Sequence, residues 1–211
     1  MRILLIALLT LFIAFPAFAQ TEAPMQASQP TKEAMEAARK RFEEAKVGAR
    51  ERFQAKQAEL KKDVAVIRDT KKKEILDRVY DSINQLNERL TKHYLDVLDN
   101  ISLILDRVTE RAQKVSDSGV DVSSVTSQVD AAKTAIETAR TSVVTQAGKT
   151  YEFAITTEAN LRSDVGVARN KLRTDLQAVR DQVRAAMQAV RTAAVTLAQL
   201  PRPSSEMESD N

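Results

Sequence analysis

Apolar residues recur in steps of three and four along three stretches of the chain, and this spacing keeps side chains on one face of an α-helix. We expect helices at about residues 71–116, 122–147 and 157–199. Their apolar stripes are Leu76, Val79, Ile83, Leu86, Leu90, Tyr94, Val97, Ile101, Ile104, Val108, Ala112 and Val115; Val122, Val125, Val129, Ala132, Ile136, Ala139 and Val143; and Leu161, Val165, Ala168, Leu172, Leu176, Val179, Val183, Ala186, Val190, Ala194 and Leu197. The pattern predicts an all-α fold in which residues 71–200 form an elongated antiparallel three-helix bundle or coiled coil.

Short segments with turn-forming residues separate these helices. Gly119 can take the left-handed conformation that ends a helix, and Asp121 can cap the helix that follows. Residues 149–156 alternate apolar and polar positions, so we expect an irregular connector, with Thr156 or Thr157 capping the third helix. The apolar side chains of this connector are expected to fill one end of the bundle: Tyr151, Phe153 and Ile155.

Residues 32–70 show a different pattern, in which charged residues dominate and helix formers are frequent. The larger apolar side chains and Ala49 form only a thin seam: Met35, Phe42, Ala49 and Phe53. We expect a long charged N-terminal helical arm that projects from the bundle or docks lightly on it. A break near Asp69 and Thr70, both candidate N-cap residues, would let this arm fold back instead.

The predicted helices differ in length, because about 26 residues span roughly 39 Å and about 43 residues span roughly 65 Å. With short connections, the third helix would start beside residue 90 and extend past the first turn, and residues 76–86 would lack a neighbour. The uncovered seam at the far end is a candidate self-association surface: Val183, Ala186, Val190, Ala194 and Leu197. Because exposed apolar stripes are costly, we expect a second copy, another helical envelope protein or the folded-back arm to cover them.

The N-terminus has the parts of a secretory signal peptide: Arg2, an apolar run at 3–15, and small residues that end at Ala19. We expect residues 1–19 to be cleaved and the protein to be exported to the periplasm or the extracellular space. A retained inner-membrane anchor is the alternative, although Pro16 interrupts the apolar run.

Two segments lack a periodic apolar pattern. Residues 20–31 contain two prolines and are expected to form a flexible linker, and residues 201–211 are expected to form a disordered tail. The chain has no cysteine, so lipid attachment through a cysteine after the cleavage site and a disulfide framework are both excluded. Stability must therefore come from helix packing.

Basic residues concentrate in the arm and at the start of the first bundle helix. The whole chain has 32 basic and 29 acidic residues, so its net charge alone indicates no partner. The candidate contacts with an anionic membrane or envelope polymer are Arg39, Lys40, Arg41, Lys61, Lys62, Lys71, Lys72 and Lys73. A solvated helix face balanced by neighbouring acids is the alternative, and nucleic acid is disfavoured because export is expected.

The sequence offers no catalytic or metal-binding pattern. His93 is the single histidine, so the two Glu-x-x-His motifs that a helical di-metal site requires cannot form. Serine and threonine cluster at 116–127 without an identifiable base, and the four glycines are too dispersed for a phosphate-binding loop. We expect a non-enzymatic protein without a cofactor or a metal site.

Residues 146–166 (QAGKTYEFAITTEANLRSDVG) and 175–186 (DLQAVRDQVRAA) resemble a family of uncharacterised secreted helical-bundle proteins of candidate-phyla (Patescibacteria-type) bacteria. The resemblance covers residues 75–199 and implies export and a helical bundle, with no assigned activity. A weaker similarity, of composition alone, is to periplasmic holdase chaperones of the Skp type, whose strand-rich assembly domain this chain lacks.

Two functions from different classes fit these observations. The first is a non-enzymatic exported envelope protein that acts as a self-associating helical scaffold or interaction module. The alternative is a periplasmic holdase-like or anionic-membrane-binding protein that uses the basic N-terminal arm.

Overall fold

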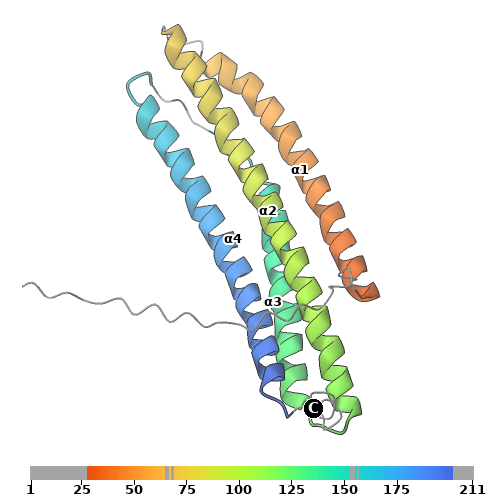
Figure 1. Ribbon diagram of the computed structural model, residues 1–211. Coiled ribbons are helices and arrows are strands. Elements are labelled where there is room, and N and C mark those ends of the chain that lie inside the picture. Colours follow the sequence, from red (N-terminus) through yellow and green to blue (C-terminus); the bar gives the residue numbers. More distant parts are fainter. Residues whose placement is uncertain (1–27, 65–66, 68, 153–154, 156, 202–211) are drawn as a thin grey trace, which may run out of the picture.

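The computed structural model describes residues 28–64, 67, 69–152, 155 and 157–201. Four helices lie side by side and form a long rod (Figure 1): α1 Gln29–Val64, α2 Thr70–Asp117, α3 Ser123–Ala147 and α4 Leu161–Ala198. The predicted all-α class is confirmed for this part of the chain. The predicted signal peptide, most of the predicted linker and nearly all of the predicted tail lie outside the described residues.

Helix α1 runs antiparallel to α2 and packs against both α2 and α3. Near one end of α1 the Ser28 amide donates to Asp106 Oδ2 at 2.8 Å, and towards the other end Gln57 Nε2 donates to Asp81 Oδ1 at 3.4 Å. Its buried side chains are Ala38, Phe42, Ala49 and Leu60. The arm therefore does not project, and four packed helices replace the expected three-helix bundle, because small alanines let α1 approach closely around Phe42.

A capped break allows α1 to fold back. Asp69 Oδ1 accepts hydrogen bonds from the amides of Lys71 at 2.9 Å and Lys72 at 3.4 Å, which have no partner within the first turn of α2. Ile67, between the two helices, is 1% exposed and anchors this turn. At its other end α1 begins inside the predicted linker, because Pro30 lies in the first helical turn, where a missing N–H removes no helical hydrogen bond.

Helices α2 and α3 are joined by the predicted turn. Gly119 has a φ of 88°, which confirms the left-handed conformation. Asp121 Oδ1 accepts from the Ser123 amide at 2.9 Å, at the start of α3, but the N-cap position is Val122, one residue later than predicted. The apolar stripe of α3 is buried as the periodicity indicated: Val125, Val129, Ala132, Ile136, Ala139 and Val143.

The two ends of the segment between α3 and α4 contact α2 at different levels. Gln146 Nε2 donates to Asn87 Oδ1 at 2.8 Å, whereas Glu158 Oε1 lies 2.6 Å from Lys72 Nζ, close to the start of α2. An extended residue covers about 3.3 Å and a helical residue about 1.5 Å, so about a dozen connector residues can cover the roughly 22 Å between these levels. Tyr151 in this connector is buried, as expected, and Phe153 lies outside the described residues.

Helix α4 therefore starts beside the start of α2, and the predicted overhangs are wrong. Near its N-terminus, α4 packs on the residues expected to lack a neighbour, in one cluster: Leu76, Tyr80, Ile83, Ala168, Leu172 and Leu176. In the candidate self-association seam, Val183, Ala186, Val190 and Leu197 are buried and Ala194 is half-buried, so packing within the chain leaves little of their surface exposed. Thr157 Oγ1 accepts from the Asn160 amide at 3.3 Å and caps a turn just before α4, which begins four residues later than expected.

Candidate interaction groove

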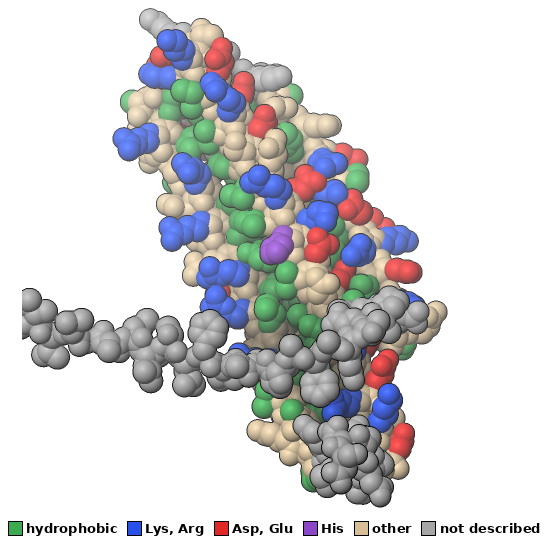
Figure 2. All heavy atoms as spheres, viewed as in Figure 1, with side chains coloured by type: hydrophobic (Ala, Val, Ile, Leu, Met, Phe, Trp, Pro, Cys, Tyr) green, Lys and Arg blue, Asp and Glu red, His purple; other side chains and the backbone are tan. Residues whose placement is uncertain are grey.

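Helices α2 and α4 leave a long groove between them, on the side of α2 opposite α1. Three adjoining depressions of about 930, 570 and 470 Å³ follow it, and neighbouring depressions share Tyr94 and Arg180, or Ile104 and Ala194. Figure 2 shows its floor as a band of hydrophobic side chains that runs along the rod. We call this feature the groove. Its apolar lining includes Val79, Ile83, Leu86, Leu90, Tyr94, Val97, Ile101, Ile104, Leu172, Leu176, Val183, Met187, Val190, Ala194 and Leu197.

The groove exists because α2 is apolar over more of its surface than its neighbours cover. The deeply buried residues of α2 include several polar ones: Asn87, Thr91, Asp99 and Ser102. Part of the apolar stripe seen in the sequence lies at the groove instead, where Leu86, Leu90, Tyr94 and Val97 are only half-buried. Ile104 of α2 is 42% exposed and Met187 of α4 is 48% exposed. A further element lying over the groove would bury these side chains.

Arginines and one lysine line the groove, and no aspartate or glutamate of the described chain does. Eight exposed cations form the rim: Arg169, Arg173, Arg180, Arg184 and Arg191 of α4, and Arg107, Arg111 and Lys114 of α2. Figure 2 shows a row of them along the α4 border of the hydrophobic band. Arg180 lies 3.5 Å from its neighbour Asp181, and the other seven have no ion pair within the described part of the chain.

The rim arginines of α4 were missed in the sequence analysis, although a signal was present. They recur at intervals of four and seven residues, which places them on one stripe of a helix. This stripe lies next to the apolar stripe of α4. This stripe alone does not indicate a binding site. It forms one only together with α2, which lies beside α4 and has its own basic residues near the other end of the groove.

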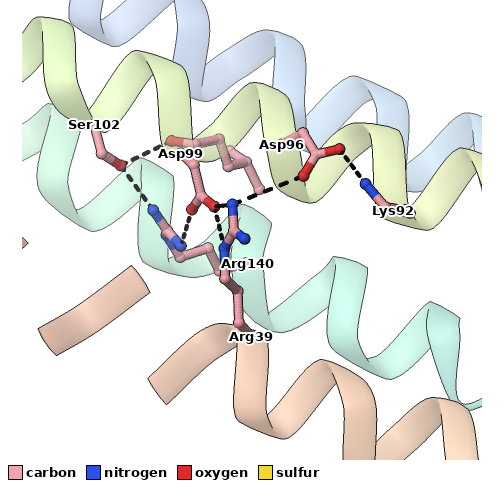
Figure 3. A network of polar contacts seen from close by, with 7 residues as sticks. Arg39, Lys92, Asp96, Asp99, Ser102 and Arg140 are labelled. Carbon is pink, nitrogen blue, oxygen red and sulfur yellow. Dashed lines mark hydrogen bonds and ion pairs between the residues drawn. The ribbon is translucent and has the colours of Figure 1, made fainter. Parts of the chain in front are cut away.

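Behind the groove, a buried ionic network joins α1, α2 and α3 (Figure 3). Asp99 of α2 accepts from Arg140 Nη1 at 2.7 Å and from Arg39 Nε at 2.9 Å. Arg140 Nη2 also donates to Ser102 Oγ at 2.9 Å. The side chains of Asp99 and Arg140 are 5% and 2% exposed, so this pair lies in the core, where each charge depends on the other.

A second polar cluster fixes the connector against α2 and α4. Gln146 Nε2 lies 2.6 Å from the Tyr151 hydroxyl, which donates to Asp175 Oδ2 of α4 at 2.8 Å. Burial raises the pKa of the Tyr151 hydroxyl. Burial opposes ionisation of Asp175, but hydrogen bonds from Tyr151 and Lys149 hold the pKa of its carboxyl below the usual value. These contacts fix the level at which α4 begins, and with it the alignment of the two groove walls.

The structure does not gather the predicted basic residues into one surface. Arg39 is committed to Asp99, Lys72 pairs with Glu158, and Lys73 is half-buried. Lys40, Arg41 and Lys71 are exposed, and the side chains of Lys61 and Lys62 lie outside the described residues. Because Arg39 is level with Asp99, the residues at 39–41 lie roughly 42 Å along α2 from those at 71–73.

The described residues offer little for metal chemistry or membrane crossing. His93 is exposed and lies beside Tyr94, with ring centroids 6.0 Å apart. Within the described chain, no three histidine, aspartate or glutamate side chains gather in an arrangement that could hold a metal ion. None of the helices described is both long and apolar enough to cross a membrane.

Comparison with protein-family models, with curated proteins and with solved structures finds no match for this chain. The resemblance to secreted helical-bundle proteins of candidate-phyla bacteria therefore stays a hypothesis.

Proposed function

We propose that the chain is a non-enzymatic exported protein of the cell envelope, an interaction module that binds another polypeptide in the groove between α2 and α4. One observation carries the proposal: an incompletely covered apolar floor that is bordered by charges of one sign. Extended apolar surface rimmed by polar residues is typical of binding sites. The expected signal peptide at residues 1–19 supports the envelope as the compartment.

The alternative use of the basic N-terminal arm, as a holdase or membrane-binding segment, has less support. The apolar seam of α1 is occupied, because Ala38, Phe42 and Ala49 are buried against the other helices. Arg39 is held by Asp99. To bind a client or a membrane with these residues, α1 would have to leave α2 and α3.

Photo-crosslinking from the groove tests the proposal. A benzophenone amino acid is placed at Met187 in the groove and, as the matched control, at exposed Thr134 on α3, in cells that produce the protein. We expect Met187 to give a defined polypeptide adduct and Thr134 to give none. The mass of the recovered protein also shows whether the chain starts at Gln20. Equal adducts from both positions, or none from Met187, would contradict the groove as the binding site.

A further inference from the structure

The dimensions of the groove match a helix. It follows α2 from Val79 to Val115, roughly 54 Å, so it can hold a helix of about 36 residues. Helices that lie in such grooves insert apolar side chains at positions i, i+3, i+4 and i+7. The floor offers apolar contacts over this whole length, and half-buried Tyr94 lies near its middle.

Helix α1 provides a precedent on the other side of α2. It lays an apolar seam against α2 and α3, and its cations meet carboxylates of α2: Arg39 meets Asp99, and Arg50 meets Glu88. At the groove the signs are reversed, because the walls carry the cations. An occupant of the same kind must therefore bring carboxylates on both flanks of its apolar face.

A second copy bound groove to groove fits poorly. In a two-fold dimer the same surface meets itself, so eight cations would face eight cations without an intervening acid. A lipid surface also fits less well, because proteins that insert at membrane interfaces present large exposed apolar side chains. Here the floor is recessed between two helices, and Ile104 and Met187 are its only large apolar residues with over two-fifths of their surface exposed in the described chain.

We infer that the groove binds an acidic amphipathic helix of a partner protein, with its apolar face on the floor and its carboxylates beside the arginines of α4. The inference rests on the proposed function and narrows the partner by its chemistry. Charge complementarity of this kind contributes chiefly to specificity and to the rate of association, so binding should weaken with salt.

A designed peptide pair tests the inference. The acidic probe is a labelled peptide of about 21 residues, roughly 32 Å as a helix, with leucine at the a and d heptad positions and glutamate at e and g. The second probe carries lysine in place of glutamate. Titrations use residues 20–211, which contain every described contact, and fluorescence anisotropy reports binding. We expect saturable binding of the acidic peptide and at least about tenfold weaker binding of the basic one.

Exposed residues allow variants that retain the fold. Arg173→Glu combined with Arg184→Glu should weaken binding of the acidic peptide by about tenfold or more and strengthen binding of the basic peptide. Met187→Glu puts a carboxylate on the apolar floor and should weaken binding of the acidic peptide. Arg41→Glu combined with Lys133→Glu reverses two charges on α1 and α3, outside the groove, and should leave binding unchanged. Circular dichroism checks that each variant is helical.

Several outcomes would overturn the inference. These are equal binding of the two peptides, equal losses in the rim and control variants, and binding to phosphatidylglycerol vesicles without binding of the acidic peptide. A dimer in light scattering that dissociates with Met187→Glu would place a second copy in the groove. If the Met187 crosslink persists but the acidic peptide does not bind, the groove remains the binding site and its acidic partner is refuted.

Discussion

Asp99 is the residue at which three helices meet. Its carboxylate receives Arg140 from α3 and Arg39 from α1, while Ser102 one turn later accepts a second hydrogen bond from Arg140. A buried ion pair contributes little net stability compared with apolar residues, but removing one partner leaves the other charge uncompensated. The two arginines differ in burial, and this difference can be measured.

We expect Arg140→Met to lower the free energy of unfolding by about 3 kcal/mol, because Asp99 loses its buried partner and Ser102 loses its donor. Arg39→Met is the matched comparison and should cost less than about 1 kcal/mol, since the Arg39 side chain is 56% exposed. Urea unfolding followed by circular dichroism measures both values. Equal losses would show that the pair is not in the core.

The burial of Tyr80 should make the free energy of unfolding depend on pH in the alkaline range. Burial, with a smaller effect of Glu152 and Asp81, raises its pKa to about 12, whereas an unfolded tyrosine ionises near pH 10. The stabilisation is complete below about pH 10 and is lost as the pH rises through the folded-state pKa, because the unfolded chain releases the proton first. We expect this tyrosine to lower the free energy of unfolding by about 1.4 kcal/mol per pH unit in that window.

The comparison of Tyr80→Phe with the unchanged chain isolates this effect. Above about pH 10, the free energy of unfolding of the variant should fall less steeply with pH, because the variant lacks the tyrosine whose ionisation favours the unfolded chain. Urea unfolding at several pH values gives the two slopes. Parallel slopes would mean that Tyr80 ionises alike in the folded and unfolded chains.

At the scale of the elements, α1 is held differently from the other three helices. Its apolar contacts are few, and ion pairs with α2 supplement them: Arg39 with Asp99 at 2.8 Å, Lys46 with Glu88 at 3.8 Å, and Arg50 with Glu88. Arg50 and Arg39 are more than half exposed, so salt can screen their attraction. Helix α3, in contrast, is held mainly by its apolar stripe.

We expect amide hydrogen exchange in α1 to become several-fold faster when salt is raised from about 0.05 M to about 0.5 M, because screening favours local detachment of this helix. Exchange in α3 should change little and serves as the internal control. Mass spectrometry of deuterated peptides resolves the two helices. A uniform change in α1 and α3 would indicate that α1 opens only with the whole molecule.

Helix positions could be predicted where the sequence repeats an apolar residue every three or four positions. The stripe from Val125 to Val143 and the glycine at 119 both have their predicted structural roles. The docking of α1 was harder to predict, since Ala38 and Ala49 carry too little apolar surface to distinguish a docked helix from a solvated one. The level of α4 was mispredicted because a short connection was assumed, whereas Gln146 and Glu158 contact levels of α2 that lie roughly 22 Å apart.

At the scale of the whole molecule, the groove depends on how separate segments are aligned. Its basic rim combines residues 169–191 of α4 with residues 107–114 of α2, which line successive stretches of one groove only when α4 starts level with the start of α2. That alignment follows from the contacts of Tyr151 and Asp175, which no periodic pattern reveals. The candidate site could therefore not be predicted from the sequence, although the basic residues of α2 and of α4 can each be read there.

The described chain enters and leaves the rod towards the same end. Ser28 contacts Asp106, and Leu200 packs against the cluster that contains Val115, whereas Asp69 begins α2 at the opposite end. A tether attached through either flanking segment would thus hold the rod at one end. Its far tip would stand roughly 50 Å or more from the attachment point, and both walls of the groove would face sideways, open to partners along that height.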